Sequence, residues 1–322
     1  VSIMPQARIC VFGSLNYDFV IMGPRLPMPG ETVKGSSFSM QTGGKGANQA
    51  LQAARLGAAA YMIGCIGRDF MGDAQIASLS DEGMITNYIA RHDSLKTGVA
   101  LISVDQSGQN EITIAANANN DCSQELLDRA QPAFDHSDVF LTQLETNIDA
   151  VLYAMEKARN AGCTIILDPA PVQTVPQKIW AMADIVKPNE TEASLFTGLS
   201  VDDADIVGWA RRAADKLRSM GAPAVLITLG ARGCWYSGGE EFHIPSFPIN
   251  TVDATAAGDS FAGALAVAMS EKQPIRQAVM FASAAGAITA SRAGAQPSIG
   301  SREEVESFLR NRSNEVLEMH RL

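Results

Sequence analysis

The stretch DATAAGDSFAGA, residues Asp253–Ala264, sets two carboxylates around residues so small that the backbone must form the local surface. Helical spacing of apolar residues follows, at Phe261 and Leu265. Amides in the first turn of a helix lack intrahelical partners, and the helix dipole adds positive potential there. Small residues at 256–258 would let a phosphate approach these amides closely. The pattern therefore predicts an anion-binding helix N-terminus beside Asp259.

Two roles suit Asp259 in this setting. A lone Asp at a helix start usually caps the helix, which is worth about 0.5–2 kcal/mol. A carboxylate beside a bound phosphoryl group can instead act as a general base toward an alcohol, and such a base contributes about 10²–10⁴ in rate. Phosphoryl transfer requires mainly positioning and charge neutralisation, which an anion-binding helix end provides. From these residues alone both roles stay open.

Around this stretch, apolar strand-like runs alternate with helical segments. The alternation predicts βαβ units, and therefore an α/β fold with a mostly parallel sheet covered on both faces. A different pattern occupies residues 97–115, where two strand-like runs flank the turn DQSGQN and predict a β-hairpin. With strand-like pieces in residues 17–42, this hairpin is expected to form a small separate sheet, a lid over the main one. We expect a single domain over residues 1–310 and a polar tail over residues 311–322.

The composition narrows the class of protein. The chain has 322 residues, 46% hydrophobic and 19% charged, which is typical of a globular domain. Its formal net charge of -10 argues against nucleic acid as a partner, since a broad phosphate-binding surface needs a basic excess. The five cysteines are scattered and never form a C-x-x-C pair, a pattern typical of reduced cytosolic thiols. Because we find no apolar run of membrane-spanning length and no signal-peptide core, we expect a cytoplasmic protein without a membrane partner.

Common nucleotide and hydrolase motifs are incomplete in this chain. Neither G-x-x-x-x-G-K-[ST] nor G-x-G-x-x-G after the first strand is present, which argues against a P-loop enzyme and a Rossmann dehydrogenase. The segment GDSFAG, residues 258–263, is close to the serine-hydrolase elbow G-x-S-x-G, but Ala262 stands at the last glycine position. Only His320, in the tail, follows Ser260. A serine hydrolase that uses Ser260 stays a distant alternative.

Polar residues recur where the predicted strands end, which is where open parallel sheets bind ligands. They are Asn16, Asp18, Glu145, Asp168, Lys187, Asn189, Glu192, Thr228 and Gly230. Because loops in any α/β protein are polar, this pattern alone does not decide between a site and ordinary loops.

Two segments, TGGKGANQA (residues 42–50) and DATAAGDSFAGA, resemble the two signature segments of the ribokinase-like carbohydrate kinase family. Further stretches are similar to family motifs, in the family's order and over nearly the whole chain: GSLNYD, IGRDFMGD, TGVALI, LTQLE, DPAP, VKPNETEA, LITLGARG and RAGAQPS. The resemblance implies a three-layer αβα sandwich around a mostly parallel sheet, with a small β-sheet lid. It also implies a phosphotransferase that phosphorylates D-ribose at the 5-hydroxyl with ATP, with Mg²⁺ essential and K⁺ activating, and a homodimer formed through the lid.

Other readings of the same motifs stay open. A kinase for another furanose or ketose, such as deoxyribose or fructose, would share every motif. A non-catalytic sugar-binding relative would lack the base, so the presence of Asp259 counts against it.

The resemblance implies roles for individual residues. Asp259 matches the catalytic base, and the amides of Ala256, Ala257, Gly258 and Asp259 match an anion hole. The sugar-binding positions are Asn16, Asp18, Gly44, Lys45, Asn48, Glu145 and Asp259. The nucleotide-binding positions are Asn189, Thr228, Gly230, Gly233, Gly258 and Ser283.

The resemblance also implies two metal sites. Glu192 matches a residue that orders Mg²⁺ through water, although the segment of Asn189 and Glu192 in isolation would more often be a helix cap with solvated acids. A monovalent-cation site behind the anion hole matches Asp253, Thr255, Thr289, Arg292, Gly294 and Ser298.

The chain departs from the family's pattern at a few positions. Ala254 and Ala256 stand where the broader signature has Thr and Gly, so a hydroxyl is missing at 254. Asp168 stands before Pro-Ala-Pro, where close members of the family often carry Asn. The resemblance implies no role for this aspartate.

Overall fold

The computed structural model describes residues 6–106 and 108–312. Its main sheet has nine strands within the described residues, in the order β13 (Glu241–Ile244), β12 (Cys234–Ser237), β11 (Val225–Thr228), β10 (Ile185–Val186), β9 (Thr164–Asp168), β8 (Val139–Gln143), β1 (Arg8–Phe12), β4 (Ala59–Gly67) and β5 (Ile85–His92). Neighbouring strands are parallel from β11 to β5, and β12 and β13 are antiparallel additions at one edge. The predicted mostly parallel sheet is confirmed.

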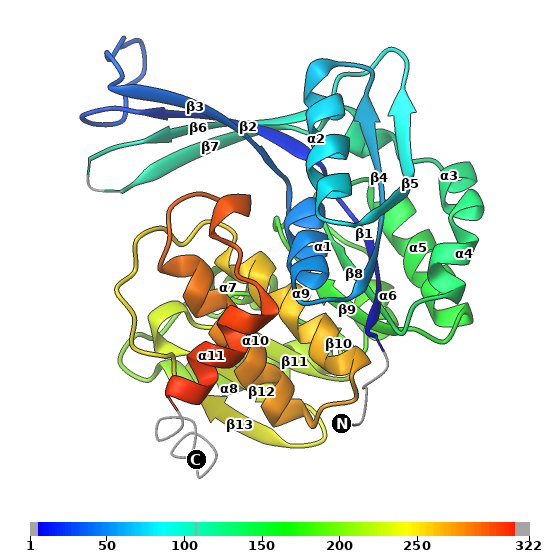
Figure 1. The fold of residues 1–322 in the computed structure, drawn as a ribbon. Helices are drawn as coiled ribbons and strands as arrows, with labels where there is room; N and C mark the ends of the chain where they lie inside the picture. Colours follow the sequence, from blue (N-terminus) through cyan, green and yellow to red (C-terminus); the bar gives the residue numbers. More distant parts are fainter. Residues whose placement is uncertain (1–5, 107, 313–322) are drawn as a thin grey trace.

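Helices cover both faces of this sheet (Figure 1). One layer contains α1 (Lys45–Arg55), α2 (Phe70–Asp81), α9 (Ala257–Ser270), α10 (Ile275–Ala290) and α11 (Arg302–Asn311). The other contains α3 (Gln124–Arg129), α4 (Gln131–Asp135), α5 (Ile148–Asn160), α6 (Lys178–Met182), α7 (Glu190–Thr197) and α8 (Ile206–Ser219). Short 3₁₀ turns are η1 (Asn117–Asp121), η2 (Gly230–Arg232) and η3 (Gln296–Ser298). The three layers agree with the αβα sandwich that the family resemblance implies.

Successive side chains of a strand point to opposite faces of the sheet, so each strand contributes alternate residues to two separate hydrophobic cores. In β1, Ile9 and Val11 belong to the core with α1 and α9, while Cys10 and Phe12 belong to the core with α5 and α8. Because both faces are buried, the strands are nearly continuous apolar runs, which is what made them recognisable in the sequence.

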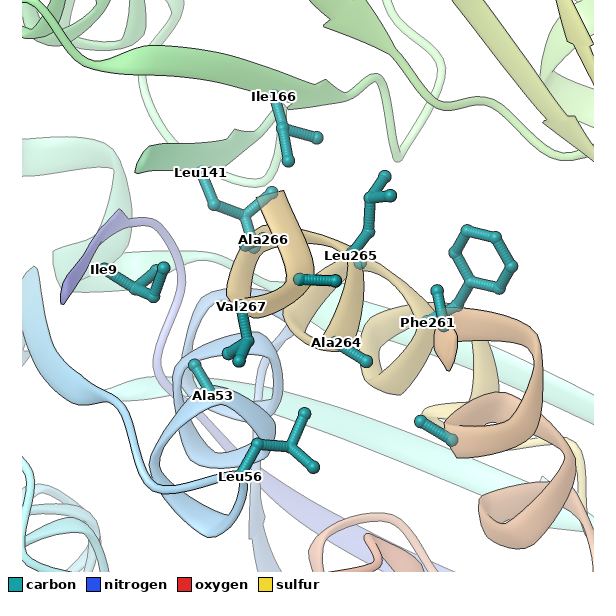
Figure 2. Packing of buried hydrophobic residues seen from close by; sticks show 14 of the residues in the cluster. Ile9, Ala53, Leu56, Leu141, Ile166, Phe261, Ala264, Leu265, Ala266 and Val267 are labelled. Atoms are coloured by element: carbon teal, nitrogen blue, oxygen red, sulfur yellow. The ribbon is translucent and has the colours of Figure 1, made fainter. Parts of the chain in front are cut away.

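Helix α9 is buried almost all round. Figure 2 shows its side chains between Leu141 of the main sheet and Leu56 at the end of α1. A helix apolar on all sides needs such an enclosed position. At Gly263 a methyl group would lie only 2.5 Å from the carbonyl oxygen of Gln49, so α1 and α9 approach closely there. This packing sets the first turn of α9 directly against α1.

The lid is a separate four-stranded sheet in the described residues, ordered β3 (Ser37–Gly43), β2 (Asn16–Met22), β6 (Gly98–Val104) and β7 (Asn110–Ala115). It extends away from the main sheet (Figure 1). The hairpin predicted in residues 97–115 is β6 and β7, paired antiparallel. In the register of the lid, Asn16 lies opposite Gly43 and Gly98. The predicted small second sheet is therefore confirmed, and its base begins just after β1 of the main sheet.

The division of the chain into one domain and a tail stays a prediction. Helix α11 extends to Asn311, and residues 313–322 of the expected tail lie outside the described residues. In the described ranges, no helix has both the length and the apolar character required to cross a membrane.

Candidate active site

Asp259 lies in the first turn of α9, with 7% of its surface exposed. Its Oδ2 accepts a hydrogen bond from Asn48 Nδ2 at 2.9 Å, and its Oδ1 accepts one from Gln49 Nε2 at 3.2 Å. The N-cap position is Ala256, and no side chain caps this helix. The capping role considered for Asp259 is therefore wrong, because both carboxylate oxygens are bound by amides of α1.

The start of α9 carries backbone amides that precede the regular helical hydrogen bonds. Ala256 has a left-handed φ of 60°, a strained conformation for a residue other than glycine and one often found at functional sites. The first intrahelical bond runs from the amide of Ser260 to the carbonyl of Ala256, so the amides of Gly258 and Asp259 precede the regular ladder. The amide of Ala257 donates to the carbonyl of Ala254 at 3.2 Å. Gly258 is exposed. The turn thus resembles an anion site, but the amide of Ala257 already has a partner.

Glu145 connects the base of the lid to α1. It follows β8, is 8% exposed, and its Oε2 accepts hydrogen bonds from the Ser14 hydroxyl, from Asn16 Nδ2 at 3.3 Å and from the Lys45 amide at 3.4 Å. Gly44, the N-cap of α1 with a φ of 94°, is buried beside this cluster. Predicted sugar-binding residues from three separate segments therefore lie together.

The electrostatics of this group are unusual for a buried region. Burial, together with the nearby carboxylates of Glu145 and Asp259, raises the pKa of Asp18 to about 7. Burial would lower the pKa of Lys45, but the carboxylates of Asp259, Asp168, Glu145 and Glu192 outweigh it and raise that pKa above its usual value. Lys45 is therefore a cation that offsets part of the negative charge of these acids.

Several buried polar atoms lack a hydrogen-bond partner within the described part of the chain, and one of them, Asn48 Oδ1, belongs to a residue that binds Asp259. Asn48 donates its amide NH₂ to Asp259, while its Oδ1 is buried without a partner. Buried polar atoms are nearly always paired, so this oxygen is suited to accept a hydrogen bond from a ligand hydroxyl.

Two further amides, which sequence reasoning missed, hold the lid strand β2 in place. Asn119 of η1 donates to Asn16 Oδ1 at 2.7 Å, and its Oδ1 accepts from the amide of Leu15 at 2.9 Å. Gln75 of α2 donates to the carbonyls of Asn16 and Gly43, the latter at 2.8 Å. Both side chains are fully buried. In the sequence Gln75 is a polar residue between the apolar positions of α2, and nothing in the polar run NANND distinguishes Asn119.

Asp168, for which the sequence predicted no role, lies close to the first turn of α9. Its Oδ2 accepts from Gln49 Nε2 at 2.8 Å, and its Oδ1 is 3.3 Å from Lys187 Nζ. Burial raises the pKa of Asp168 to about 6, although Lys187 opposes that rise. Lys187 Nζ also donates to the carbonyl of Gly258 at 3.2 Å. Sequence reasoning noted Lys187 only as polar and passed over Gln49.

Asn189 and Glu192 form the start of α7. The Asn189 side chain accepts from the amide of Glu192 at 2.8 Å, and Glu192 Oε2 accepts from the amide of Asn189 at 2.8 Å, so the two make a capping box. The helix cap that the sequence suggested for these two residues is therefore present. Asn189 forms a β-bridge with Thr228, the last residue of β11. The predicted Mg²⁺-ordering pair therefore lies beside the predicted nucleotide loop.

The nucleotide loop is shaped by its own backbone. Gly230 has a φ of 55° and Gly233 a φ of 90°, and a methyl group on Gly233 would lie 1.9 Å from the carbonyl oxygen of Ile244. The Ser283 hydroxyl donates to Val279 in its own helix, at 2.8 Å. Ser283 Oγ also lies 3.9 Å from the sulfur of Cys234, which follows the loop.

The predicted monovalent-cation residues come from two segments that the structure joins. The Asp253 carboxylate accepts from the amides of Thr255 and Gly294, each at 2.9 Å. These bonds hold the pKa of Asp253 below its usual value, although burial alone would raise it. The other side chains bind elsewhere: Thr289 to Ser260 at 2.8 Å, Arg292 to Glu304 at 2.6 Å and Ser298 to the carbonyl of Ala295 at 2.6 Å.

Ser260 does not suit a hydrolase nucleophile. It is fully buried, and its hydroxyl oxygen accepts a hydrogen bond from Thr289. His320, the histidine weighed as its partner, lies outside the described residues. A nucleophile must reach its substrate, so the burial of Ser260 argues against the hydrolase alternative.

Comparisons with known proteins cover nearly the whole chain. The model of the pfkB family of carbohydrate kinases matches residues 6–302. A ribokinase from Haemophilus influenzae is 38% identical over 305 residues, 94% of this chain and 99% of that one. A deoxyribokinase from Salmonella typhi is 32% identical over 94% of this chain and 98% of its own length. The structure of Arabidopsis thaliana ribokinase complexed with ribose and ATP has a TM-score of 0.85 and 30% identity, and covers 95% of this chain and 99% of that one.

Proposed function

This chain belongs to the pfkB family of carbohydrate kinases, and from that premise we propose that it transfers the terminal phosphoryl group of ATP to the 5-hydroxyl of D-ribose. The observation that supports this proposal most strongly is the position of the Asp259 carboxylate, which Asn48 and Gln49 hold at the N-terminus of α9. This arrangement combines a base with an anion-binding turn.

In the proposed reaction, Asp259 accepts the proton of the 5-hydroxyl as that oxygen bonds to the phosphorus. The bond from phosphorus to the bridging oxygen of ATP breaks, and ADP leaves. The amides of Gly258 and Asp259, with those of Ala256 and Ala257, stabilise the negative charge of the phosphoryl oxygens. The Ala257 amide would exchange its present bond to Ala254 for the phosphate.

For the sugar, we assign the cluster at the base of the lid. Asn16, Asp18, Asn48 and Glu145 offer carboxylate and amide groups that suit hydroxyl recognition, because buried polar groups left unpaired disfavour a wrong substrate. The unpaired Oδ1 of Asn48 supports this assignment. Gly44 and Lys45 complete the set, with the lid closing to exclude water.

For the nucleotide, we assign Asn189, Thr228, Gly230, Gly233, Gly258 and Ser283. Within the described ranges, no three His, Cys, Asp or Glu side chains are grouped for direct metal binding. Mg²⁺ usually keeps several waters and binds substrate phosphates, which is compatible with ordering through water by Glu192. Mg²⁺ would neutralise phosphate charge during transfer.

A monovalent cation such as K⁺ belongs to the proposal as an activator. The loop of Asp253 and Thr255 is joined to the segment of Thr289, Arg292, Gly294 and Ser298 by the bonds of Asp253. Because the side chains have other partners, backbone carbonyls are the available ligands. An ion there would stiffen the loop before the anion-binding turn.

We also propose a homodimer through the lid. Ile21, Phe38, Met40 and Leu101 are exposed and, by the strand register, share one face of the lid. A second copy covering this face would bury them. Sedimentation of the wild type and of Leu101→Glu tests this: a dimer that becomes monomeric is expected, and a monomeric wild type contradicts it.

Two assignments about the whole chain belong to the same proposal. We propose one kinase domain over residues 1–310. The described cysteines are all free and buried, which with the use of ATP suits a cytoplasmic location.

The test of function is turnover of purified protein with Mg²⁺·ATP and a sugar panel of ribose, deoxyribose and fructose, with and without K⁺. We expect the highest kcat/KM with ribose, a 5-phosphate product and a rate increase with K⁺. A preference for deoxyribose would favour the alternative supported by the Salmonella typhi relative. Absence of phosphorylated product with every sugar would contradict the kinase proposal.

A further inference from the structure

A buried ion pair lies directly behind the anion-binding turn and has no part in the reaction outlined above. Asp168 closes β9 and Lys187 follows β10, and the two side chains are 3% and 4% exposed. The ammonium and the carboxylate are 3.3 Å apart. Charges buried this deeply lose much hydration energy, so such a pair needs further hydrogen bonds to be tolerated.

Each member of the pair has its further bond toward the first turn of α9. Lys187 Nζ donates to the carbonyl of Gly258 at 3.2 Å. Asp168 Oδ2 accepts from Gln49 Nε2 at 2.8 Å, and that same nitrogen donates to Asp259 Oδ1 at 3.2 Å. The pair is thus connected to this turn at two points, one on the backbone and one on the base.

The orientation of the Gln49 amide is set from its other end. Gln49 Oε1 accepts from Gln143 Nε2 at 2.6 Å, so the NH₂ group of Gln49 must face the two carboxylates. Asp168 then keeps that NH₂ group in place beside Asp259. Without Asp168, the Gln49 side chain would lose the shorter of its two bonds to carboxylates.

The bond of Lys187 acts on an amide of the anion-binding turn. The carbonyl of Gly258 and the N–H of Asp259 belong to one planar peptide group and point in opposite directions. A cation on the carbonyl therefore fixes the direction of the Asp259 N–H. It also polarises the peptide group, which makes that N–H a stronger donor.

We propose that Asp168, Lys187 and Gln49 are positioning residues that hold the carboxylate and the amide of Asp259 in the arrangement required for phosphoryl transfer. The proposal rests on the proposed kinase function. It gives a role to the aspartate that stands before Pro-Ala-Pro. Asn at 168 would still accept from Gln49, but Lys187 would then be a buried cation without a countercharge.

The test uses the full chain with Asp168→Asn, Lys187→Met and the double variant, assayed with the sugar that the wild type phosphorylates best. The matched control is Glu271→Gln, at the opposite end of α9, which breaks the ion pair of a similarly buried carboxylate with Arg302. Melting temperatures identify an assay temperature at which every variant is folded.

We expect each single variant to lower kcat by about 10- to 100-fold, because small misplacements of reacting groups have effects of this size. The KM values for sugar and ATP should change by less than about threefold, since ground-state contacts are retained. The double variant should be within about threefold of Lys187→Met, because the bond to the Gly258 carbonyl is missing from both and Asn at 168 still accepts from Gln49. The control should retain the kcat of the wild type.

Several results would overturn the positioning role. One is a kcat above half of the wild-type value in both single variants. Another is a double variant with the kcat of the wild type, which would mean that the single variants suffer only from an unpaired buried charge. A third is an equal loss of kcat in the control. Wild-type turnover tests the kinase function separately: an inactive wild type overturns both proposals, and an active wild type with unaffected variants overturns this one alone.

Discussion

The acceptor side and the nucleotide side of the proposed site are built in different ways. On the acceptor side, side chains distant in sequence bind one another, as Asn48 binds Asp259 and Asn16 binds Glu145. On the nucleotide side, the side chains mostly bind nearby in sequence, as Asn189 binds Glu192 and Ser283 binds its own helix, and the loop at Gly233 bends on itself. The acceptor side therefore depends on the packing of the whole fold, and the nucleotide side depends on backbone conformation. Substitutions on the two sides should fail differently.

The largest effect is expected at Asp259. In Asp259→Asn the side chain keeps its shape but can no longer accept a proton, so kcat should fall by about 10²–10⁴ while sugar affinity stays within a few-fold of wild type. Steady-state kinetics and calorimetric sugar binding measure the two quantities. Asp128→Asn, which removes a surface ion pair with Lys157, is the control and should retain full turnover. Full turnover in Asp259→Asn would end the assignment of the base.

The next largest effect is a pH-dependent stability at Asp18. Its pKa is raised to about 7 by burial and by the Glu145 and Asp259 carboxylates, so the folded state binds its proton more tightly than the unfolded chain does. The stabilisation from this proton is full below about pH 4, near the unfolded pKa, and is lost as the pH rises to 7. Asp18→Asn removes this loss. The difference in free energy of unfolding between Asp18→Asn and the wild type should therefore change by about 2–4 kcal/mol in favour of the variant between pH 4 and pH 8.

Asp253 provides the control of opposite sign. Its pKa is lowered because the hydrogen bonds from Thr255 and Gly294 outweigh burial. Its stabilisation is therefore present above the unfolded pKa and is lost on acidification. Asp253→Asn should lose stability relative to wild type at neutral pH, and less so in acid. Denaturant unfolding from about pH 2 to 8 measures both variants, since the loss at Asp253 falls below pH 4, and parallel profiles for the two would contradict the opposed environments.

A smaller effect, confined to the nucleotide side, is expected at Gly233. Gly233→Ala would force a side chain onto a φ of 90° and a methyl group against the Ile244 carbonyl, which should reduce stability by about 2–3 kcal/mol. The KM for ATP should rise more than the KM for the sugar. Gly239→Ala is the matched control, because nothing lies within 4 Å of its added methyl group. Equal effects of the two substitutions would refute the steric argument.

The smallest effect is expected at Asn189. Asn189→Ala removes one half of a capping box and should lower the free energy of unfolding by about 1 kcal/mol. Ser301→Ala does the same to the capping box of α11, away from the proposed nucleotide loop. Both variants should melt alike, but only Asn189→Ala should raise the KM for Mg²⁺·ATP. If neither substitution changes that KM, Asn189 only caps α7 and has no part in nucleotide binding.

Sequence reasoning predicted the features that depend on short-range patterns. The parallel strands were recognisable because each is buried on both faces, and the hairpin of β6 and β7 was recognisable from its Gly-containing turn. The contacts of Gln49, Gln75 and Asn119 were missed because each depends on a partner more than fifty residues away. The same limit left the capping role of Asp259 open, since a carboxylate at a helix start has the same local sequence whether it caps or faces another helix.

The close approach of α1 and α9 at Gly263 has a consequence for changing this protein's substrate in the laboratory. One added carbon there would push the two helices apart and draw Asn48 and Gln49 away from Asp259, a full turn from the substitution itself. Libraries for directed evolution should therefore leave the contact between α1 and α9 unchanged and diversify β2 and β6, where the bound sugar is expected to contact the lid.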